Sequence, residues 1–120
     1  MNAILLVEDN EKNMKLLRDV LTAKGYSVLE ATTGEAAVEV TLAEEPRLVL
    51  MDVQLPGIDG VEALRRVRAD ERTAGLPVLA LTAQAMEGDR ERFLAAGFDG
   101  YLSKPVDIVE LLATVAAYMH

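Results

Sequence analysis

Five polar residues of this sequence each end or directly follow a short apolar run: Glu8, Asp9, Asp52, Thr82 and Lys104. Three carboxylates brought together would repel one another unless a cation neutralised them, and their hard oxygen atoms favour Mg²⁺. A lysine, a hydroxyl and a divalent cation around one carboxylate would suit a phosphoryl group, because the cations offset its charge and the hydroxyl donates a hydrogen bond. Whether these residues can meet depends on the elements that carry them.

Asp52 interrupts the stretch RLVLMDVQLPGIDG, residues 47–60. A continuous apolar run indicates a strand that is covered on both faces, so the charged residue should lie at the strand's C-terminal end, at the mouth of a loop. In open α/β sheets, ligands bind at that edge. On its own, however, Asp52 could simply begin the turn that follows, which is rich in Pro and Gly.

The other four residues also have ordinary explanations. Glu8 and Asp9 could form the solvated start of a helix, and Thr82 could cap another. Lys104 could be a surface charge. What favours a site is that all of them lie at the same end of alternating elements.

The predicted strands are short apolar runs that alternate with helix-period segments: residues 3–7, 26–31, 47–53, 77–82 and 100–103. Five helices follow them. Their markers are Leu17, Val20 and Leu21, with Gly25 as a C-terminal cap; Thr33 as a cap before Ala37 and Val40, ending before Pro46; Val61, Leu64 and Val67; Met86, Arg90, Phe93 and Leu94, ending at Gly97; and Ile108, Leu111, Leu112, Val115, Ala116 and Met119.

This alternation predicts an α/β fold, with a parallel sheet and helices on both faces. Residues 1–120 are expected to form a single domain, since the sequence contains no linker, repeat or low-complexity tract, and no effector domain is expected. Parallel strands point their C-terminal ends the same way, so the five polar residues can meet at one edge.

Composition excludes several classes of site. The 120 residues include no Cys and one His, at the C-terminus, which excludes thiolate metal sites and nearly excludes a Ser/His/Asp triad. With 12 basic and 20 acidic residues the net charge is −8, which argues against nucleic acid as a partner. The sequence also has no Gly-rich phosphate loop, signal peptide or membrane-spanning segment, so we expect a cytoplasmic protein that does not bind nucleotides.

The motifs LLVEDN, LMDVQLPGIDG, ALTA and YLSKP occur in this order and resemble the receiver domain of two-component response regulators over essentially the whole chain. The resemblance implies a doubly wound (βα)5, flavodoxin-like sandwich with strand order 2-1-3-4-5. It implies a phosphoacceptor signalling domain, which catalyses only its own phosphorylation and autodephosphorylation. The implied phosphoryl donor is a histidine kinase or a histidine phosphotransfer protein, and the implied cofactor is Mg²⁺ or Mn²⁺.

The resemblance also assigns roles to the acidic residues. Asp52 matches the phosphoacceptor, a carboxylate nucleophile that also contacts the metal. Asp9 matches a direct metal ligand and Glu8 a ligand acting through water, where Glu in place of Asp is a common variation. The backbone carbonyl of Gln54 would complete the ligands.

Other positions match groups around the phosphoryl site. Lys104 would pair with the phosphoryl oxygens, and Pro105 would follow it in a cis peptide bond. Thr82 and Tyr101 match the two switch residues, a hydroxyl that moves toward the phosphoryl group and an aromatic that turns inward. The backbone of Ala83 would contact the phosphoryl group.

Two further positions, Gln54 and Gln84, match places that tune the lifetime of the phosphorylated state. The added charge of about −2 would draw Thr82 and Lys104 inward and shift a two-state equilibrium. The output face would be the fourth helix, fifth strand and fifth helix, binding a downstream protein or forming a weak homodimer. The expected outer side of the fifth helix carries apolar residues that suit this role: Val109, Ala113, Ala117 and Tyr118.

Four alternatives remain at this stage. The chain could be a receiver excised from a hybrid histidine kinase, which EDNEKNMKL and TAQAMEGDRERF resemble as much as they resemble single-domain regulators of cell-cycle type. An Asp-nucleophile phosphatase of the haloacid dehalogenase type would need an acid where Gln54 stands. A flavodoxin-like FMN binder would need a Ser/Thr-rich loop where EDNEKN stands. A receiver that no longer accepts phosphate is disfavoured, because every active-site position is filled.

Overall fold

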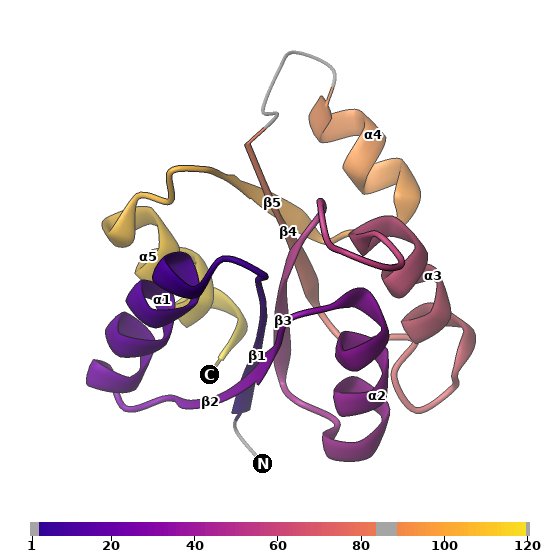
Figure 1. Cartoon of the computed structure of the whole chain (residues 1–120), viewed down its shortest axis with the longest axis horizontal. Coiled ribbons are helices and arrows are strands. Elements are labelled where there is room, and N and C mark those ends of the chain that lie inside the picture. The colour runs from indigo at the N-terminus through magenta and orange to yellow at the C-terminus, as the bar shows by residue number, and fades with distance from the viewer. Residues whose placement is uncertain (1–2, 84–88, 120) are drawn as a thin grey trace.

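A computed structural model describes residues 3–83 and 89–119 of the chain, and its fold is a five-stranded parallel sheet between two layers of helices (Figure 1). The strands are β1 (Ala3–Val7), β2 (Ser27–Ala31), β3 (Leu48–Asp52), β4 (Val78–Thr82) and β5 (Gly100–Ser103). The helices are α1 (Glu11–Ala23), α2 (Gly34–Glu44), α3 (Gly60–Ala69), α4 (Asp89–Ala96) and α5 (Ile108–Tyr118). The strand order is β2-β1-β3-β4-β5, which confirms the predicted fold class and order.

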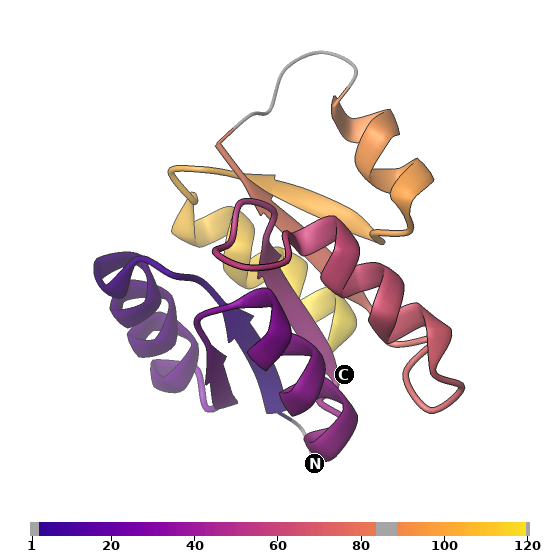
Figure 2. The same cartoon turned by 45° about the vertical axis from the view of Figure 1, so that its right-hand side comes forward.

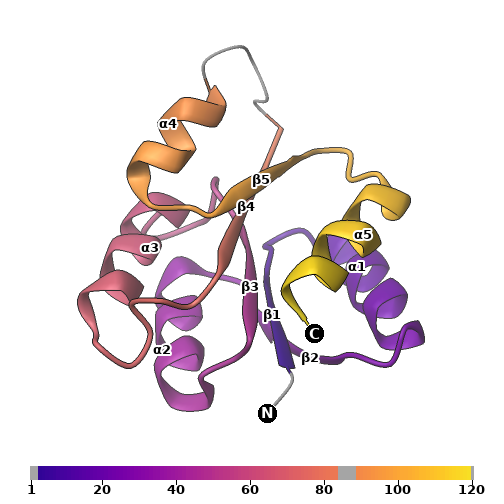
Figure 3. The ribbon, with the colours of Figure 1, turned by 180° about the vertical axis from the view of Figure 1, so that it is seen from behind.

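Two hydrophobic clusters hold the layers together. Met14, Leu17 and Leu21 of α1 and Leu111 and Val115 of α5 pack on one face of the sheet. Figure 3 shows both helices on the same side of the sheet, to its right in that view. The clusters use alternate residues of the central strands, so β1, β3 and β4 are buried along their whole length, as their continuous apolar runs predict.

Helices α2, α3 and α4 pack on the opposite face. Their contributions to its core include Ala37, Ala63, Leu64 and Phe93. The strand ends that carry the polar residues are therefore anchored in a core that is covered from both sides.

Side-chain caps start α1, α2, α3 and α5, and the sequence predicts one of them, Thr33. Thr33 Oγ1 accepts a hydrogen bond from the Ala36 N–H at 3.0 Å, which confirms it as the cap of α2. Gly25 follows α1 with a φ of +92°, a conformation that favours glycine. Met86, a predicted marker of the fourth helix, lies outside the described residues, and α4 ends just before Gly97.

Several predicted ends and faces differ from the structure. β2 and β4 each begin one residue later than predicted, and β3 is shorter than predicted by one residue at both ends. Val53 leaves β3 because its carbonyl accepts the Gly60 N–H instead of continuing the ladder. On α5, Ala116 is exposed although the periodicity places it in the core, whereas Tyr118 packs against the core instead of facing outward. A short helix over the sheet buries only a narrow stripe, so residues at its margins are poorly predicted by spacing.

None of the helices in residues 3–83 and 89–119 combines the length and the apolar character that crossing a membrane requires.

Candidate functional site

The loops after β1, β3, β4 and β5 leave the sheet at one edge, the upper edge in Figure 1. They enclose an open, polar cleft of about 500 Å³. Its lining includes four of the five predicted polar residues and several of their chain neighbours: Glu8, Asp9, Asn10, Asn13, Asp52, Gln54, Ala83 and Lys104.

Asp52 is the last residue of β3 and is only 5% exposed. Its Oδ1 accepts a hydrogen bond from the Gln54 N–H at 2.9 Å, and its Oδ2 lies 2.7 Å from Lys104 Nζ. A charge-assisted contact and a backbone donor together offset the cost of burying this carboxylate. The strand end therefore fixes one carboxylate rigidly at the wall of the cleft.

Lys104, in the loop after β5, contacts the residues at the ends of the neighbouring strands β1 and β3. Its Nζ also lies 2.6 Å from Oε2 of Glu8, whose other oxygen accepts the Asn10 N–H at 3.1 Å. Glu8 is 1% exposed, so neither it nor Lys104 fits the alternative of a solvated surface charge.

Glu8 and Lys104 each influence the pKa of the other. Burial raises the pKa of Glu8 above its usual value and the charge of Asp52 adds to the effect, while the hydrogen bonds from Lys104 and Asn10 oppose it. Burial lowers the pKa of Lys104, but its hydrogen bonds to Asp52 and Glu8 outweigh this and leave the pKa raised. Lys104 therefore stays cationic across the physiological range.

The donor set fits a divalent cation. One carboxylate oxygen each from Glu8, Asp9 and Asp52 lie within 4.8 Å of one another, and Asp9 reaches the cluster from an exposed position. One lysine faces three carboxylates, which leaves negative charge for a cation to balance. Clustered carboxylate oxygens that are open to water are the environment that Mg²⁺ prefers, because it retains several of its waters.

Three other predicted residues, Thr82, Tyr101 and Pro105, belong to β4, β5 and the loop that follows β5. Thr82 is buried at the end of β4, and its carbonyl accepts the Lys104 N–H at 2.7 Å. The peptide bond between Lys104 and Pro105 is cis. Tyr101 is half-buried and its ring centroid lies 6.2 Å from that of Phe93, while Gln84 lies outside the described residues.

Sequence reasoning missed two residues that shape the site. Asn10 caps α1 through its side chain and donates its N–H to Glu8, so it orients the first acidic residue. Gly60 lies so close to β3 that a Cβ there would be 2.5 Å from the carbonyl oxygen of Asp52. An Asn before a helix was a visible cap signal, whereas the close approach at Gly60 depends on tertiary packing.

Comparison with known proteins agrees with this arrangement. The sequence model of the response regulator receiver domain family matches residues 4–116 of this chain. The polar-differentiation response regulator DivK of Brucella ovis is 39% identical over 117 residues, which cover 98% of this chain and 95% of DivK.

Two solved structures are similar over nearly the whole chain. The receiver domain of the sensor histidine kinase PA1611 from Pseudomonas aeruginosa has a magnesium ion in its active-site cleft. It is 39% identical with a TM-score of 0.91, covering 98% of this chain and 97% of that one. The receiver domain of the Saccharomyces cerevisiae response regulator Ssk1, co-crystallised with the histidine phosphotransfer protein Ypd1, is 30% identical with a TM-score of 0.90, covering 98% of this chain and 88% of that one.

The family match spans almost the whole described chain, and the strand order and acidic cleft agree with it. A phosphatase of the haloacid dehalogenase type is not favoured. The chain belongs to the receiver domains of two-component response regulators, a family of signalling proteins.

Proposed function

We propose that Asp52 accepts a phosphoryl group from a phosphohistidine on a histidine kinase or a histidine phosphotransfer protein. The observation that carries this proposal is the position of Lys104, whose Nζ lies within 2.7 Å of both Asp52 and Glu8. A fixed ammonium beside a strand-end carboxylate can bind the incoming phosphoryl oxygens while the carboxylate oxygen attacks phosphorus. The P–N bond breaks, and its electron pair returns to the imidazole.

The metal would be held by Asp9 and Asp52, with Glu8 acting through water and the Gln54 carbonyl completing the protein ligands. Bound Mg²⁺ or Mn²⁺ would neutralise charge on the transferring phosphoryl group. Thr82 and the Ala83 backbone lie at the end of β4, where they can contact that group once it is on Asp52.

The output is a change in protein binding. Phosphorylation draws Thr82 and Lys104 toward the new charge, and Tyr101 turns inward beside them. The face formed by α4, β5 and α5 carries exposed apolar side chains, including Leu94 at 41% and Val109 at 79% exposure. A downstream protein or a second copy of the chain would bind there.

The chain would also catalyse the loss of its own phosphoryl group, at a rate set by Gln54 and Gln84. It would act in the cytoplasm. Its relatives include a response regulator and the receiver domain of a histidine kinase, so it would serve either as a stand-alone regulator or as the receiver of a kinase.

Intact mass spectrometry after incubation with acetyl phosphate and Mg²⁺ tests the acceptor. We expect the wild-type chain to gain one phosphoryl group and Asp52→Asn to gain none while keeping its circular dichroism spectrum. Lys104 remains able to contact the Asn amide oxygen, so the variant should fold. Undiminished labelling of Asp52→Asn would remove Asp52 as the acceptor.

A further inference from the structure

The loop between β3 and α3, residues 53–59, carries Gln54 and forms one wall of the cleft. Its two ends are fixed by the site itself. Gln54 donates its N–H to Asp52 Oδ1, and the Gly60 N–H donates to the Val53 carbonyl at 3.0 Å. The tip of the loop, at Gly57 and Ile58, lies between these two ends and is held by a separate contact.

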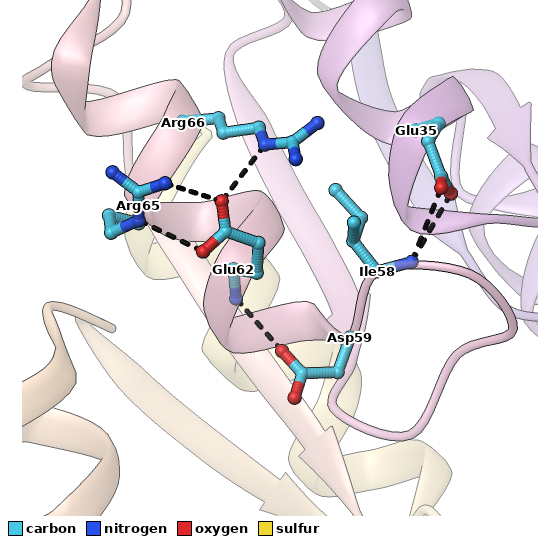
Figure 4. A network of polar contacts seen from close by, with 6 residues as sticks. All are labelled: Glu35, Ile58, Asp59, Glu62, Arg65 and Arg66. Carbon is cyan, nitrogen blue, oxygen red and sulfur yellow. Dashed lines mark hydrogen bonds and ion pairs between the residues drawn. The ribbon is translucent and has the colours of Figure 1, made fainter.

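Glu35, in the first turn of α2, reaches that tip. Both of its carboxylate oxygens accept the Ile58 N–H, at 3.4 Å for Oε1 and 3.3 Å for Oε2 (Figure 4). The two residues are 23 positions apart in the sequence, so this contact joins α2 to the loop before α3. Figure 2 shows the loop between β3 and α3 above the N-terminal end of α2.

Two glycines flank this contact at very close range. A Cβ at Gly57, whose φ is +76°, would be 2.3 Å from Glu35 Oε1. A Cβ at Gly34 would be 2.3 Å from the Ile58 carbonyl oxygen. Glycine at both positions therefore lets the loop tip rest directly on the start of α2.

We propose that Glu35 is a positioning residue for the metal site: it holds the tip of the loop 53–59 on α2, so that Gln54 is already in place when the cation binds. This inference rests on the proposed function, because it deepens the role given there to Gln54 and the acidic cluster. A loop that is ordered beforehand loses less conformational entropy when the cation binds. Glu35 thus increases metal affinity without touching the metal.

Two substitutions separate the reach of this side chain from its charge. Glu35→Asp keeps the charge and suits the first turn of a helix, but its carboxylate is withdrawn by one methylene group. Glu35→Gln removes the charge and keeps an acceptor oxygen at full reach. Glu39→Asp is the matched control, since Glu39 is an exposed residue one turn further along α2.

Two measurements on the full chain read out the effect. Amide hydrogen exchange of Ile58 without metal reports directly on the hydrogen bond between Ile58 and Glu35. Calorimetric titration with MgCl₂ measures the Mg²⁺ affinity. We expect Glu35→Asp to speed Ile58 exchange and to weaken Mg²⁺ binding about tenfold, the low end of what outer-shell partners contribute. The Ile58 exchange rate and the Mg²⁺ affinity of Glu35→Gln and Glu39→Asp should stay within about twofold of wild type. Each of these variants keeps an oxygen at position 35 that can accept the Ile58 N–H.

A purely structural role would lower the thermal midpoint without changing the Mg²⁺ affinity of the folded protein, and that result would overturn the inference. Equal losses in Glu35→Asp and Glu39→Asp, or a larger loss in Glu35→Gln than in Glu35→Asp, would also overturn it. If the wild-type chain binds Mg²⁺ as expected but takes no phosphoryl group from acetyl phosphate, the proposed function fails while the result for Glu35 stands.

Discussion

At the scale of single residues, the site depends on one lysine shared by two buried carboxylates. Lys104 Nζ lies 2.6 Å from Glu8 and 2.7 Å from Asp52, although these residues come from three different strand ends. Asp9 differs from both, because it is exposed and reaches the cluster from the side that is open to water. The buried pair is thus partly neutralised without metal, whereas Asp9 adds charge that only a bound cation would offset.

The first prediction concerns Asp9→Ala. Removing this carboxylate should weaken Mg²⁺ binding by about tenfold or more, because Mg²⁺ takes few direct protein ligands. The apo protein should become more stable by about 1 kcal/mol at most, since repulsion with Glu8 and Asp52 acts through water on that side. Calorimetry and urea unfolding without metal check the two effects. Unchanged Mg²⁺ affinity would exclude Asp9 as a ligand.

The second prediction concerns Gln54, an exposed residue at the wall of the cleft. Hydrolysis of an aspartyl phosphate needs a water in line with the leaving oxygen, and an amide side chain can hold that water. We expect Gln54→Met to lengthen the lifetime of phosphorylated Asp52 by several-fold to about tenfold, a barrier change of about 1.4 kcal/mol. Phosphate release from the purified phosphoprotein in Mg²⁺ buffer measures the rate. Equal decay of wild type and variant would mean that Gln54 does not position the water.

At the scale of elements, the start of α3 is fixed by a polar network that continues the loop from the site (Figure 4). Asp59 Oδ1 accepts the Glu62 N–H at 2.9 Å and so caps the helix. The Glu62 carboxylate in turn contacts Arg65 at 2.6 Å and Arg66 at 2.9 Å. The network anchors the helix end of the loop whose tip rests on Glu35.

The third prediction is a pH dependence at this helix. The hydrogen bonds from Arg65 and then Arg66 lower the pKa of Glu62 from 4.5 to about 2. A carboxylate with a lowered pKa in the folded state stabilises the fold above its unfolded pKa, and this contribution is lost as pH falls from 4.5 through about 2.

Glu62→Gln should therefore lose less stability than wild type between pH 5.5 and pH 3, as measured by urea unfolding. Glu110→Gln is the control, because Glu110 lies at the same position in the first turn of α5, after Asp107 as its cap. If Glu62→Gln lost as much stability as wild type between pH 5.5 and pH 3, the result would contradict the ion-pair network.

The sequence predicted these elements well where local chemistry decides them and less well where packing does. Apolar runs predicted all five strands, and Thr33 predicted the start of α2, because strand burial and capping depend on neighbouring residues. The α5 periodicity misplaced Ala116 and Tyr118, whose burial depends on how far the sheet extends beneath the helix. The edge at which the polar residues meet was predictable from strand direction alone.

The contacts within the site were less predictable. The resemblance named Glu8, Asp52 and Lys104, but not that one ammonium bridges both carboxylates. The contact between Glu35 and Ile58 left no signal in the sequence, since it joins a helix and a loop that are 23 residues apart and meet only through the tertiary fold.

At the scale of the whole molecule, a chain of net charge −8 concentrates three of its carboxylates at one sheet edge. The two hydrophobic clusters beneath hold that edge rigid, so the repulsion cannot relax by moving the strands apart. A cation that binds there should stabilise the entire fold, because it binds the native state and not the unfolded chain.

The last prediction follows from this linkage. Once the Mg²⁺ concentration exceeds its dissociation constant, the free energy of unfolding should rise by about 1.4 kcal/mol for each tenfold increase in Mg²⁺, and reach about 2.7 kcal/mol at one hundred times that constant. Salt also stabilises an acidic protein by screening the repulsion between its charges. If screening were the only effect, NaCl at the same ionic strength would stabilise the fold as much as MgCl₂ does. Urea unfolding in matched series of the two salts separates these effects. The site predicts a steep dependence on MgCl₂ alone, which Asp9→Ala should flatten, whereas equal stabilisation by both salts would mean that the acidic cluster binds no cation specifically.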